Sequence, residues 1–523
     1  MDDKATNVRF KVFVLIVIWF MIIGGIALGW RYLVRPKQEA EEHKKTEAKR
    51  HEIIEKTSAP SRYKYTVNMA ADTFSGYAIM RNASFRDENT KFGIRIELTD
   101  DQADYPQRLM NLAEGKLDMA AFTIDALFKS ATDAVAAKKI ELDNIPTIVA
   151  IIDETKGADA MVASKLKFPN LDSLNIPDLK IVCVKDSPSE TLARVVMAHF
   201  NLDRLPDNPF DFKANIDDVY KEYQRTKPTE SKVFVMWEPM VSKVVENPDY
   251  HNLVNSGKFR GYIVDVIVAR RGFLLQNKEL AVDVVKSYLK SMYDARMSMP
   301  QLIFDDARMC GTTLRIEQAK ALVDQIWWKN TQENFSHFGL TTSKGVQHLQ
   351  EINSNIMDVL LKTKAIKEDI SIGQPNFWYS ELVMRQLFDS SWHPGFGEEA
   401  VRQEKSLVVL NEDQWKQLNP VGTLQVPRLV FARGGTRLNE SSFSTLDKLV
   451  ESLKTWPQYY LMVEGHHANG GDDQANRELA EARAKAAVEY LISKGVDRSR
   501  IHAETSKTNG STTVAFVLGE LPY

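Results

Sequence analysis

The chain has 523 residues, which is long enough for two to four domains. Its composition, 44% hydrophobic and 26% charged, is ordinary for folded domains, and a net charge of −3 excludes a global positive field for nucleic acid. The two cysteines, Cys183 and Cys310, stand in no metal-like spacing, so the sequence predicts neither a disulfide scaffold nor a zinc site. We interpret them as two buried thiols, with a single disulfide as the alternative.

The N-terminal segment predicts a membrane anchor. The run 12–30 carries no charged residue, and as a helix it would be about 28 Å long, enough for a bilayer core of about 30 Å. We predict a cytoplasmic tail over 1–11 and a transmembrane helix over 12–32. A cleaved signal peptide is disfavoured because the bulky, basic GWRYLVRP stands where a cleavage pattern would be expected. Gly25 and Gly29 allow close contact with a membrane partner or a second copy.

A charged segment follows the predicted anchor. Residues 37–57 include 12 charged side chains and almost no apolar ones, so this stretch cannot form a core of its own. Pairs such as Glu41 and Lys45 are spaced for a solvated helix. We therefore predict a charged helical stalk over 33–62.

Residues 63–392 alternate strand-like and helix-like segments. Short apolar runs such as IRIEL, TIVAII and KIVCV are separated by amphipathic stretches, which predicts an α/β fold with largely parallel sheets. The strand-like runs fall into two sets, and the chain returns to the first set near Asp265. Two crossings of this kind are typical of a hinged, two-lobed binding protein.

Six segments of this region resemble periplasmic solute-binding proteins of ABC transporters, of the nitrate/sulfonate/taurine and thiamine-precursor class. They are FSGY, EGKLDMAAFTIDA, DETKGADAMVAS, KDSPSET, VFVMWEP and DVIVARRGFL, in the same chain order as in that family. The resemblance implies a two-lobed type II periplasmic-binding-protein fold with a small solute bound in the cleft.

The residues expected to meet that solute are polar or aromatic and follow strand ends. Ser187 and Ser189 begin a helix whose free N–H groups suit an anionic solute, and Asp125 stands at a strand-to-helix turn. Aromatic side chains commonly line such pockets. The predicted set is Tyr77, Thr123, Asp125, Ser187, Ser189, Trp237 and Glu238.

These residues also have structural interpretations. Ser187 and Asp125 fit ordinary helix caps, and the two aromatic residues fit the core. Asp265 stands between two valines, and we interpret it as a hinge residue rather than a ligand-binding one.

The C-terminal part predicts a second folded domain. Residues 393–421 mix Pro, Gly and aromatic residues and are interpreted as a linker. Residues 422–523 alternate strand and helix patterns, beginning with RLVFARGG as a strand, and predict a βαβαββ α+β domain. A long helix is expected to end before Gly495.

This domain resembles the OmpA-like peptidoglycan-binding domain in LVFARG, VEGHHANGG and NRELAEARAKAAVEYLISKGV. In that family an Asp after Gly-His and an Arg in the next helix hold the diaminopimelate of the wall peptide. A carboxylate suits the ammonium and a guanidinium suits the carboxylate of such a zwitterion. The Arg position matches Arg483, with Asn476 two turns earlier on the same face, whereas the Asp position falls on Ala468.

Three interpretations of the missing acid stay open. Asp472 or Asp473 replaces it from the glycine-rich loop. The domain binds the wall weakly or through other groups. Alternatively, it is a scaffold that docks a protein.

The predicted anchor together with the two family resemblances implies a single-pass inner-membrane protein with most of its chain in the bacterial periplasm. It would sense a small solute and contact peptidoglycan or an envelope protein, with no nucleic-acid partner and no cofactor. No Gly-x-Ser-x-Gly, P-loop or paired metal-ligand motif occurs, so we expect no enzyme. The alternatives are a stator-like or envelope-complex subunit and the solute-binding component of an ABC transporter.

Overall fold

This computed structural model describes residues 62–312, 314–343, 345–374, 376–392, 394, 407–467, 472–506 and 513–522. The predicted tail, the predicted transmembrane helix and nearly all of the predicted stalk lie outside these residues. Within the described ranges, no helix is both long enough and apolar enough to cross a membrane. Residues Thr66–Tyr523 form one compact unit.

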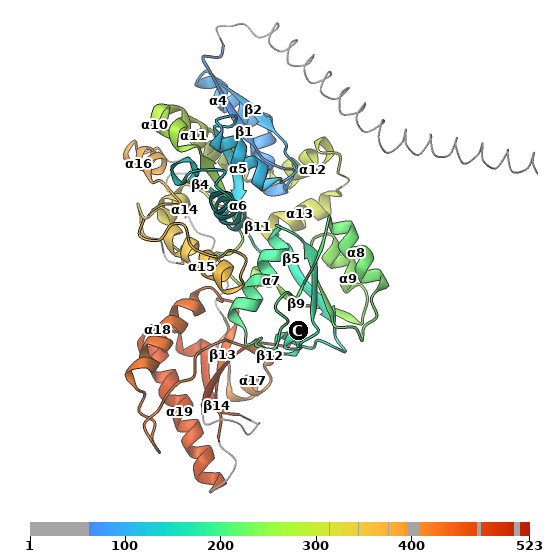
Figure 1. Cartoon of the computed structure of the whole chain (residues 1–523), viewed down its shortest axis with the longest axis vertical. Helices are drawn as coiled ribbons and strands as arrows, with labels where there is room; N and C mark the ends of the chain where they lie inside the picture. The colour runs from blue at the N-terminus through green and yellow to red at the C-terminus, as the bar shows by residue number, and fades with distance from the viewer. Residues whose placement is uncertain are drawn as a thin grey trace, which may run out of the picture. The chain divides into compact units, whose positions relative to one another are not determined.

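Lobe 1 is built on a mixed sheet that, within the described residues, has six strands in the order β11-β4-β10-β3-β1-β2 (Figure 1). Its strands are β1 (Tyr65–Ala70), β2 (Ile94–Thr99), β3 (Met119–Thr123), β4 (Thr147–Thr155), β10 (Val264–Ala269) and β11 (Ile326–Trp328). β3, β4 and β10 are buried along their whole length, as strands covered on both faces should be.

Helices from two parts of the chain belong to lobe 1. The first group precedes the crossing into lobe 2 and comprises η2 (Ser75–Tyr77), α3 (Ala78–Arg81), α4 (Ala83–Lys91), α5 (Tyr105–Ala113), α6 (Ile124–Ala136) and η3 (Leu142–Asn144). The second group follows the return and comprises α10 (Arg271–Gln276), α11 (Lys278–Ala295), α12 (Met299–Met309), α13 (Ile316–Gln325), α14 (Thr331–His337), α15 (Leu349–Lys362) and α16 (Leu382–Asp389).

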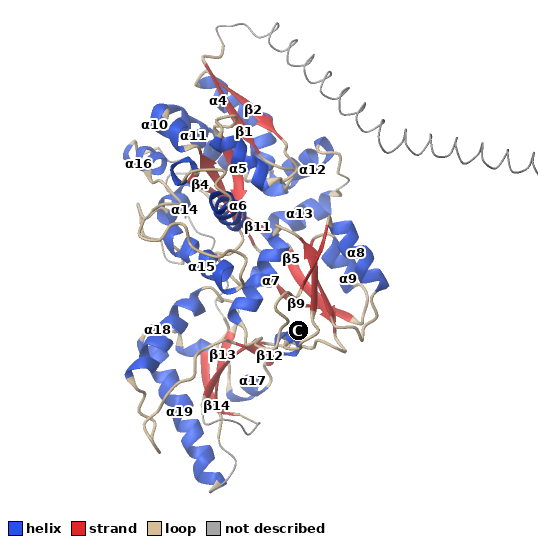
Figure 2. Ribbon diagram, in the orientation of Figure 1, coloured by secondary structure: helices blue, strands red, loops and turns tan. Residues whose placement is uncertain are grey.

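Lobe 2 covers the range 159–255, which is fully described, and has five strands in the order β7-β6-β8-β5-β9. α7 lies on one face of the sheet, and α8 and α9 lie on the other (Figure 2). Its elements are β5 (Asp159–Ser164), η4 (Leu171–Leu174), β6 (Lys180–Val184), α7 (Pro188–His199), β7 (Phe210–Lys213), α8 (Ile216–Arg225), β8 (Lys232–Trp237), α9 (Met240–Val245) and β9 (Tyr250–Asn255).

The chain crosses between the lobes after β4 and returns before β10, through η5 (Ser256–Lys258). The expected two-lobed architecture is therefore confirmed, but the expectation of largely parallel sheets is only partly right. β1 pairs with β3 in parallel, whereas β10 runs antiparallel to both β3 and β4. The physical reason is the return itself, because a strand that comes back from lobe 2 enters lobe 1 opposite to the strand that left it.

The two cysteines are both free thiols, as expected, but only one of them is buried. Cys183 is buried in β6, and Cys310, at the end of α12, is partly exposed.

The C-terminal domain has the predicted βαβαββ order, but its first strand is not the predicted one. RLVFARGG contributes only a bridge between Phe431 and Leu438, whereas β12 (Asn419–Thr423) pairs with β15. In the described part of the domain the sheet order is β12-β15-β13-β14. The other elements are α17 (Glu412–Lys416), α18 (Glu440–Lys454), β13 (Tyr460–Gly465), α19 (Asp473–Ser493), η6 (Arg498–Arg500), β14 (Ile501–Thr505) and β15 (Val514–Glu520).

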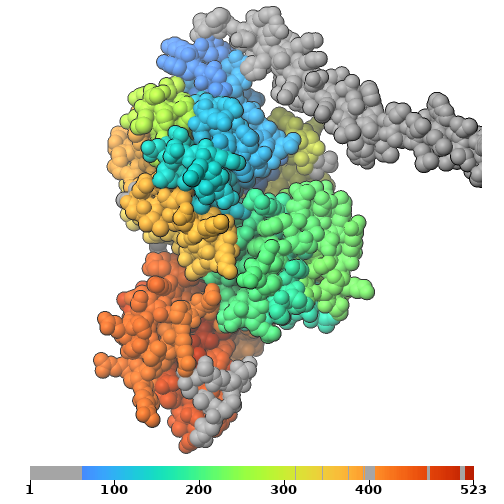
Figure 3. Space-filling view, viewed as in Figure 1, coloured from blue at the N-terminus to red at the C-terminus, as the bar shows by residue number. Residues whose placement is uncertain are grey.

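The C-terminal domain is hydrogen-bonded to lobe 2 through the strand that the sequence missed. The Asp172 carboxylate accepts bonds from the backbone N–H of Thr423 at 2.7 Å and from its hydroxyl at 2.9 Å. Phe200, directly after α7, forms an antiparallel bridge with Leu424. On the face drawn in Figure 3, the orange C-terminal domain adjoins the green second lobe.

Trp456 is the apolar centre of this interface. It is 0% exposed, and its ring packs edge-on against Phe200 of lobe 2 and Phe259 of the return segment. Beside it, Nε2 of His199 lies 2.7 Å from the Tyr262 hydroxyl, and burial lowers the pKa of His199 to about 4. The imidazole is therefore neutral at pH 7 and adds no charge to the interface.

Trp456→Ala should release the C-terminal domain from lobe 2. Emptying a fully buried Trp site costs about 3–5 kcal/mol. We expect scanning calorimetry to resolve the single transition into two and limited proteolysis to cut near residue 407. Val430→Ala, at a side chain that is 49% exposed, is the control and should melt as the wild type does. A single unshifted transition in Trp456→Ala would contradict this role.

Candidate functional site

Two helix starts, one from each lobe, face each other at the junction of the lobes. α6 begins directly after β3, and Thr123 is its N-cap residue. α7 begins shortly after β6, and the Ser187 side chain accepts a bond from the Glu190 N–H at 3.3 Å. The sequence places polar groups at both starts because each strand ends where the chain must turn into a helix.

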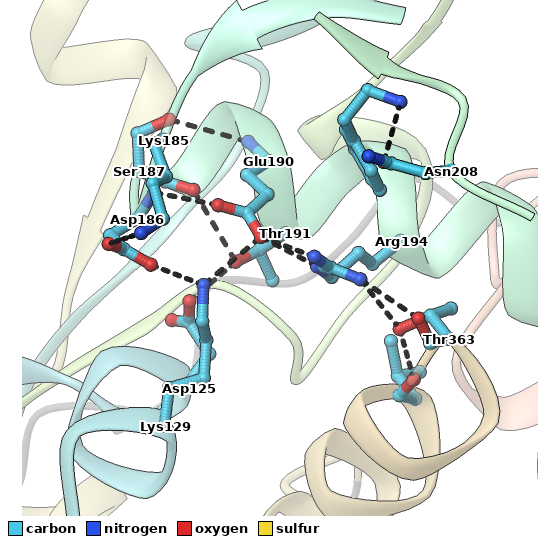
Figure 4. Close-up of polar contacts among 12 residues, drawn as sticks. Asp125, Lys129, Lys185, Asp186, Ser187, Glu190, Thr191, Arg194, Asn208 and Thr363 are labelled. Carbon is cyan, nitrogen blue, oxygen red and sulfur yellow. Dashed lines mark hydrogen bonds and ion pairs between the residues drawn. The ribbon is translucent and has the colours of Figure 1, made fainter. Parts of the chain in front are cut away.

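Direct contacts join these two helix starts (Figure 4). The Thr191 hydroxyl of α7 donates to the Asp125 carboxylate of α6 at 2.5 Å. Nζ of Lys129, one turn further along α6, lies 3.0 Å from the Glu190 carboxylate and also bonds to Asp186. A hydrogen bond and a cation shared by two acids therefore hold lobe 1 to lobe 2.

Side chains of this chain already occupy the polar groups at the start of α7. The Glu190 carboxylate accepts a bond from the Asp186 N–H at 2.6 Å and pairs with Arg194 at 2.7 Å. Within the first turn of α7, the Glu190 N–H is bonded to the Ser187 hydroxyl and the Thr191 N–H to the Ser187 carbonyl, so these groups already have partners in this chain. The geometry of this helix start does not favour a further anion.

A second polar group lies where the hinge strands meet. β4 and β10 pair so that Asp153 stands directly opposite Asp265. The Tyr77 hydroxyl donates to the Asp265 carboxylate, and Tyr77 is fully buried beneath Phe74. A Cβ at Gly76 would collide with the Asp153 carboxylate, so glycine at this position leaves room for the acid.

Burial changes the protonation of the acids at the hinge. It raises the pKa of Asp153 to about 7, and the neighbouring Asp265 carboxyl takes part in that titration. Burial and the charge of Asp153 raise the pKa of Asp265 well above its ordinary value. The Asp153–Asp265 pair therefore holds a proton near neutral pH.

Lobe 2 contributes a further buried acid, Asp159, at the junction of the lobes. It begins β5 and accepts a bond from the Ser189 hydroxyl at 2.8 Å. Burial raises the pKa of Asp159 to about 7, with Ser189 opposing and Asp125 adding to the rise. Burial also raises the pKa of Asp125.

The remaining predicted cleft residues lie at the edge of this cluster. Trp237 ends β8, and its Cα is the ladder partner of Asp159. The Glu238 carboxylate accepts bonds from the N–H and hydroxyl of Ser242 and so caps α9. The structure thus groups Tyr77, Asp125 and Ser189 with the buried acids Asp265 and Asp159. Glu238 has a local structural role.

Sequence reasoning missed Asp153, Asp159 and Lys129 and assigned Asp265 only to the hinge. One signal was present, because Asp265 is the one charge in an apolar strand and Asp153 follows the apolar run TIVAII in β4. A buried charge in a strand covered on both faces needs a partner. Among the described residues, no three His, Cys, Asp or Glu side chains are grouped to hold a metal ion.

In the C-terminal domain, Arg483 supports the loop before α18. Its Nε donates to the Gly435 carbonyl at 3.0 Å, and its guanidinium lies 5.1 Å from the centre of the Phe431 ring. Burial lowers the pKa of Arg483, which remains charged. The side chain is half-buried and keeps N–H groups beyond the Gly435 bond.

The acids proposed as substitutes for the one missing at Ala468 have other partners. Asp472 caps α19 by accepting bonds from the N–H groups of Gln474 and Ala475. Asp473 pairs with Arg477 at 2.9 Å and is exposed. Asn476 lies on the first turns of the same helix as Arg483. Ala468 lies outside the described residues.

Comparison with known proteins identifies the C-terminal region. Residues 430–515 match the model of the OmpA family, so the predicted OmpA-type domain is confirmed. The chain is 32% identical over 74 residues to a peptidoglycan-associated lipoprotein of Rhizobium meliloti, which is 14% of this chain and 42% of that protein. It is also 32% identical over 69 residues to outer membrane porin F of Pseudomonas aeruginosa, 13% of this chain and 20% of that protein. The chain therefore spans less than half of these relatives.

Solved structures similar to this chain include binding proteins at low identity. The periplasmic aliphatic sulphonate binding protein of Escherichia coli aligns with a TM-score of 0.44 and 14% identity, covering 66% of this chain and 98% of its own. The periplasmic nitrate-binding protein of Synechocystis aligns with a TM-score of 0.43 and 11% identity, covering 62% and 89%. The two-lobed architecture follows from this chain's own two sheets and from its two crossings between them.

Lys129→Met should weaken the contact between the lobes. The change keeps the length of the side chain but removes the cation shared by Asp186 and Glu190, which leaves Glu190 with Arg194 alone. We expect small-angle scattering to show a larger radius of gyration. Lys185→Met is the matched control because that lysine is mostly exposed and lies 3.7 Å from Asp186. Equal radii of gyration for the two variants would show that Lys129 does not hold the lobes together.

The stability of the protein should fall as pH rises through 7. Asp159 has a pKa of about 7 when folded against an ordinary 3.8, so its contribution is complete below about pH 4 and lost as pH rises through 7. Asp159→Asn should remove roughly 2–3 kcal/mol of that decline between pH 5 and pH 8. Thermal melts across this range measure it. The exposed Asp207→Asn should keep the wild-type slope, and an unchanged slope in Asp159→Asn would contradict the assignment.

Proposed function

We propose that this chain is a bacterial envelope protein that binds a small solute between its lobes and contacts the cell wall or an envelope partner through its C-terminal domain. Residues 12–32 anchor it in the inner membrane, and the bulk of the chain is periplasmic. It carries out no catalysis in this proposal. The names of its relatives, a peptidoglycan-associated lipoprotein and an outer membrane porin, support an envelope location for the C-terminal domain.

The observation that carries the proposal is how the chain's two ends connect to the lobes. The N-terminal segment leads directly into β1, which belongs to lobe 1. The C-terminal domain is bonded to lobe 2 through Asp172 and to the return segment, where the Arg260 N–H donates to the Thr455 carbonyl. A hinge motion between the lobes would therefore change the geometry between the anchor and the wall-facing domain.

α7 connects the proposed solute site directly to the C-terminal domain. Its first turn carries Thr191 and Glu190 against lobe 1, and its last residue, His199, accepts a backbone bond from Gln425 of the C-terminal domain. A helix of 12 residues is about 18 Å long and stiff on that scale. Solute-dependent closure would move α7 and the C-terminal domain together.

A stator-like or envelope-complex subunit is the second candidate. It is favoured by the small-residue pair Gly25 and Gly29 in the predicted span, which allows packing with a multi-span membrane protein or a second copy. Co-purification of such a membrane partner would support it. The third candidate is the solute-binding component of an ABC transporter, for which docking of lobe 2 by a wall-side domain has no evident use.

Sedimentation of the full-length chain with purified peptidoglycan sacculi, in mild detergent, tests the wall contact. Because Ala468 stands at the family's acid position, we expect the wild type to sediment weakly and Ala468→Asp to bind about tenfold more tightly, as one charge-assisted contact of about 1.4 kcal/mol gives. Arg483→Ala should abolish sedimentation.

Arg498→Ala, at a mostly exposed arginine, is the control and should sediment as the wild type does. If none of these proteins sediments, the wall contact is refuted and the domain is a docking module for another protein. Circular dichroism of Arg483→Ala separates loss of binding from loss of the loop held by Gly435.

A further inference from the structure

Four carboxyl groups are buried together where the lobes meet. Asp125 and Asp153 come from lobe 1, Asp159 from the start of lobe 2, and Asp265 from the strand that returns. Their exposed fractions are 3%, 0%, 4% and 1%. They influence one another electrostatically, since the charges of Asp153 and Asp125 raise the pKa of Asp265, and the charge of Asp125 raises that of Asp159.

The hydrogen-bond donors around these acids are too few. Asp159 and Asp265 receive hydroxyl bonds from Ser189 and Tyr77, and Asp125 receives them from Thr191 and Thr123. Apart from the Asp265 carboxyl, no N–H or O–H of the described residues donates to either oxygen of Asp153, and the Oδ1 of Asp125 is also unpartnered. The Asp265 carboxyl meets Asp153 across the β4–β10 pair and shares a proton with it. Buried acceptors of this kind cost free energy unless a donor reaches them.

The cations of the neighbourhood are engaged with other acids. Lys129 pairs with Asp186 and Glu190, Lys329 pairs with Glu154 at 2.8 Å, and Arg108 pairs with Asp72 and Asp101. Lys129 and Lys329 still lower the pKa of Asp125 and Asp153, but burial outweighs them and the net shifts are upward. The cluster therefore retains an excess of acid over base.

Aromatic side chains adjoin the same acids. Tyr77 packs edge-on against Phe74 with ring centres 5.4 Å apart, and the Trp328 indole N–H donates to the Gly76 carbonyl. The Tyr288 hydroxyl is fully buried and unpartnered, and the charges of Asp153 and Asp265 raise its pKa. Carboxylates beside aromatic rings are a favourable environment for an organic cation.

We propose that the solute bound between the lobes is an organic cation carrying an ammonium or guanidinium group, held by Asp125, Asp153, Asp159 and Asp265. This inference rests on the proposed solute-binding function and names its ligand class. The cation would supply N–H donors to the unpartnered oxygens of Asp153 and Asp125 and would replace the protons that these buried carboxyls hold. The unpartnered oxygens come from hinge strand β4 and from α6, which touches lobe 2, so a ligand there would act on closure directly.

The test is titration calorimetry on the full-length protein with four probes: n-butylammonium, guanidinium, ethanesulfonate and nitrate. We expect saturable binding of at least one of the two cations and no binding of either anion. At pH 6.5 binding should release protons, which is seen as heat that depends on the ionisation enthalpy of the buffer. Asp153→Asn, which keeps the shape of the side chain, should weaken binding at least tenfold, whereas Asp207→Asn should leave it unchanged.

The remaining outcomes separate this inference from the function on which it rests. Saturable binding of ethanesulfonate or nitrate without the cations would overturn the cation assignment and leave solute binding intact. Binding of no probe would overturn both the cation assignment and solute binding by the cleft, while sedimentation with sacculi would still decide the wall contact. Cation binding that Asp153→Asn does not weaken would place the ligand elsewhere and overturn the site.

Discussion

The antiparallel pairing of β4 with β10 is the constraint on which the rest of the molecule depends. These two strands carry the chain from lobe 1 to lobe 2 and back, and their register sets Asp153 opposite Asp265 at the point of crossing. Both strands are buried along their whole length, so the two carboxyls are held in a dry environment. Acids in such a place either hold protons or bind a cation. Burial therefore disfavours the charged form of both acids at the hinge.

A second set of contacts links lobe 1, lobe 2 and the C-terminal domain. α7 meets lobe 1 through Thr191 and Glu190 at its start and meets the C-terminal domain through His199 at its end. Trp456 fills the space between the return segment and the residue after α7. A buried Trp with edge-on aromatic neighbours stabilises one geometry of the interface. The C-terminal domain is thus joined to lobe 2 rather than suspended on a free linker.

The sequence was informative where apolar runs are long and β-branched. TIVAII, KIVCV and KVFVMW became β4, β6 and β8 because such residues favour buried strands. NPVGT became β12 against its weak propensity, because pairing with β15 and the bonds to Asp172 outweigh local preference. RLVFARGG has the stronger pattern but supplies only a bridge and the loop that Arg483 supports.

The candidate site was only partly predictable for a related reason. Tyr77, Asp125 and Ser189 could be selected from local motifs, but their partners Asp265, Thr191 and Asp159 lie 188, 66 and 30 residues away. Strand register and lobe contact decide those pairs, and a single sequence does not specify them. The excess of acid, and with it the ligand class, became visible only once four carboxyls from separate segments met in one place.

The central claim is that the C-terminal domain moves with lobe 2 when the lobes change their separation. Fluorescence energy transfer in the full-length protein measures this directly, with labels at Met297→Cys in lobe 1, Leu166→Cys in lobe 2 and Lys485→Cys in the C-terminal domain, all exposed positions, and the native cysteines changed to serine. When a solute binds between the lobes, or when Lys129→Met weakens their contact, the account predicts a change in the distance from lobe 1 to lobe 2. The distance from lobe 2 to the C-terminal domain should stay constant. A varying second distance, or a first distance that never varies, would contradict it.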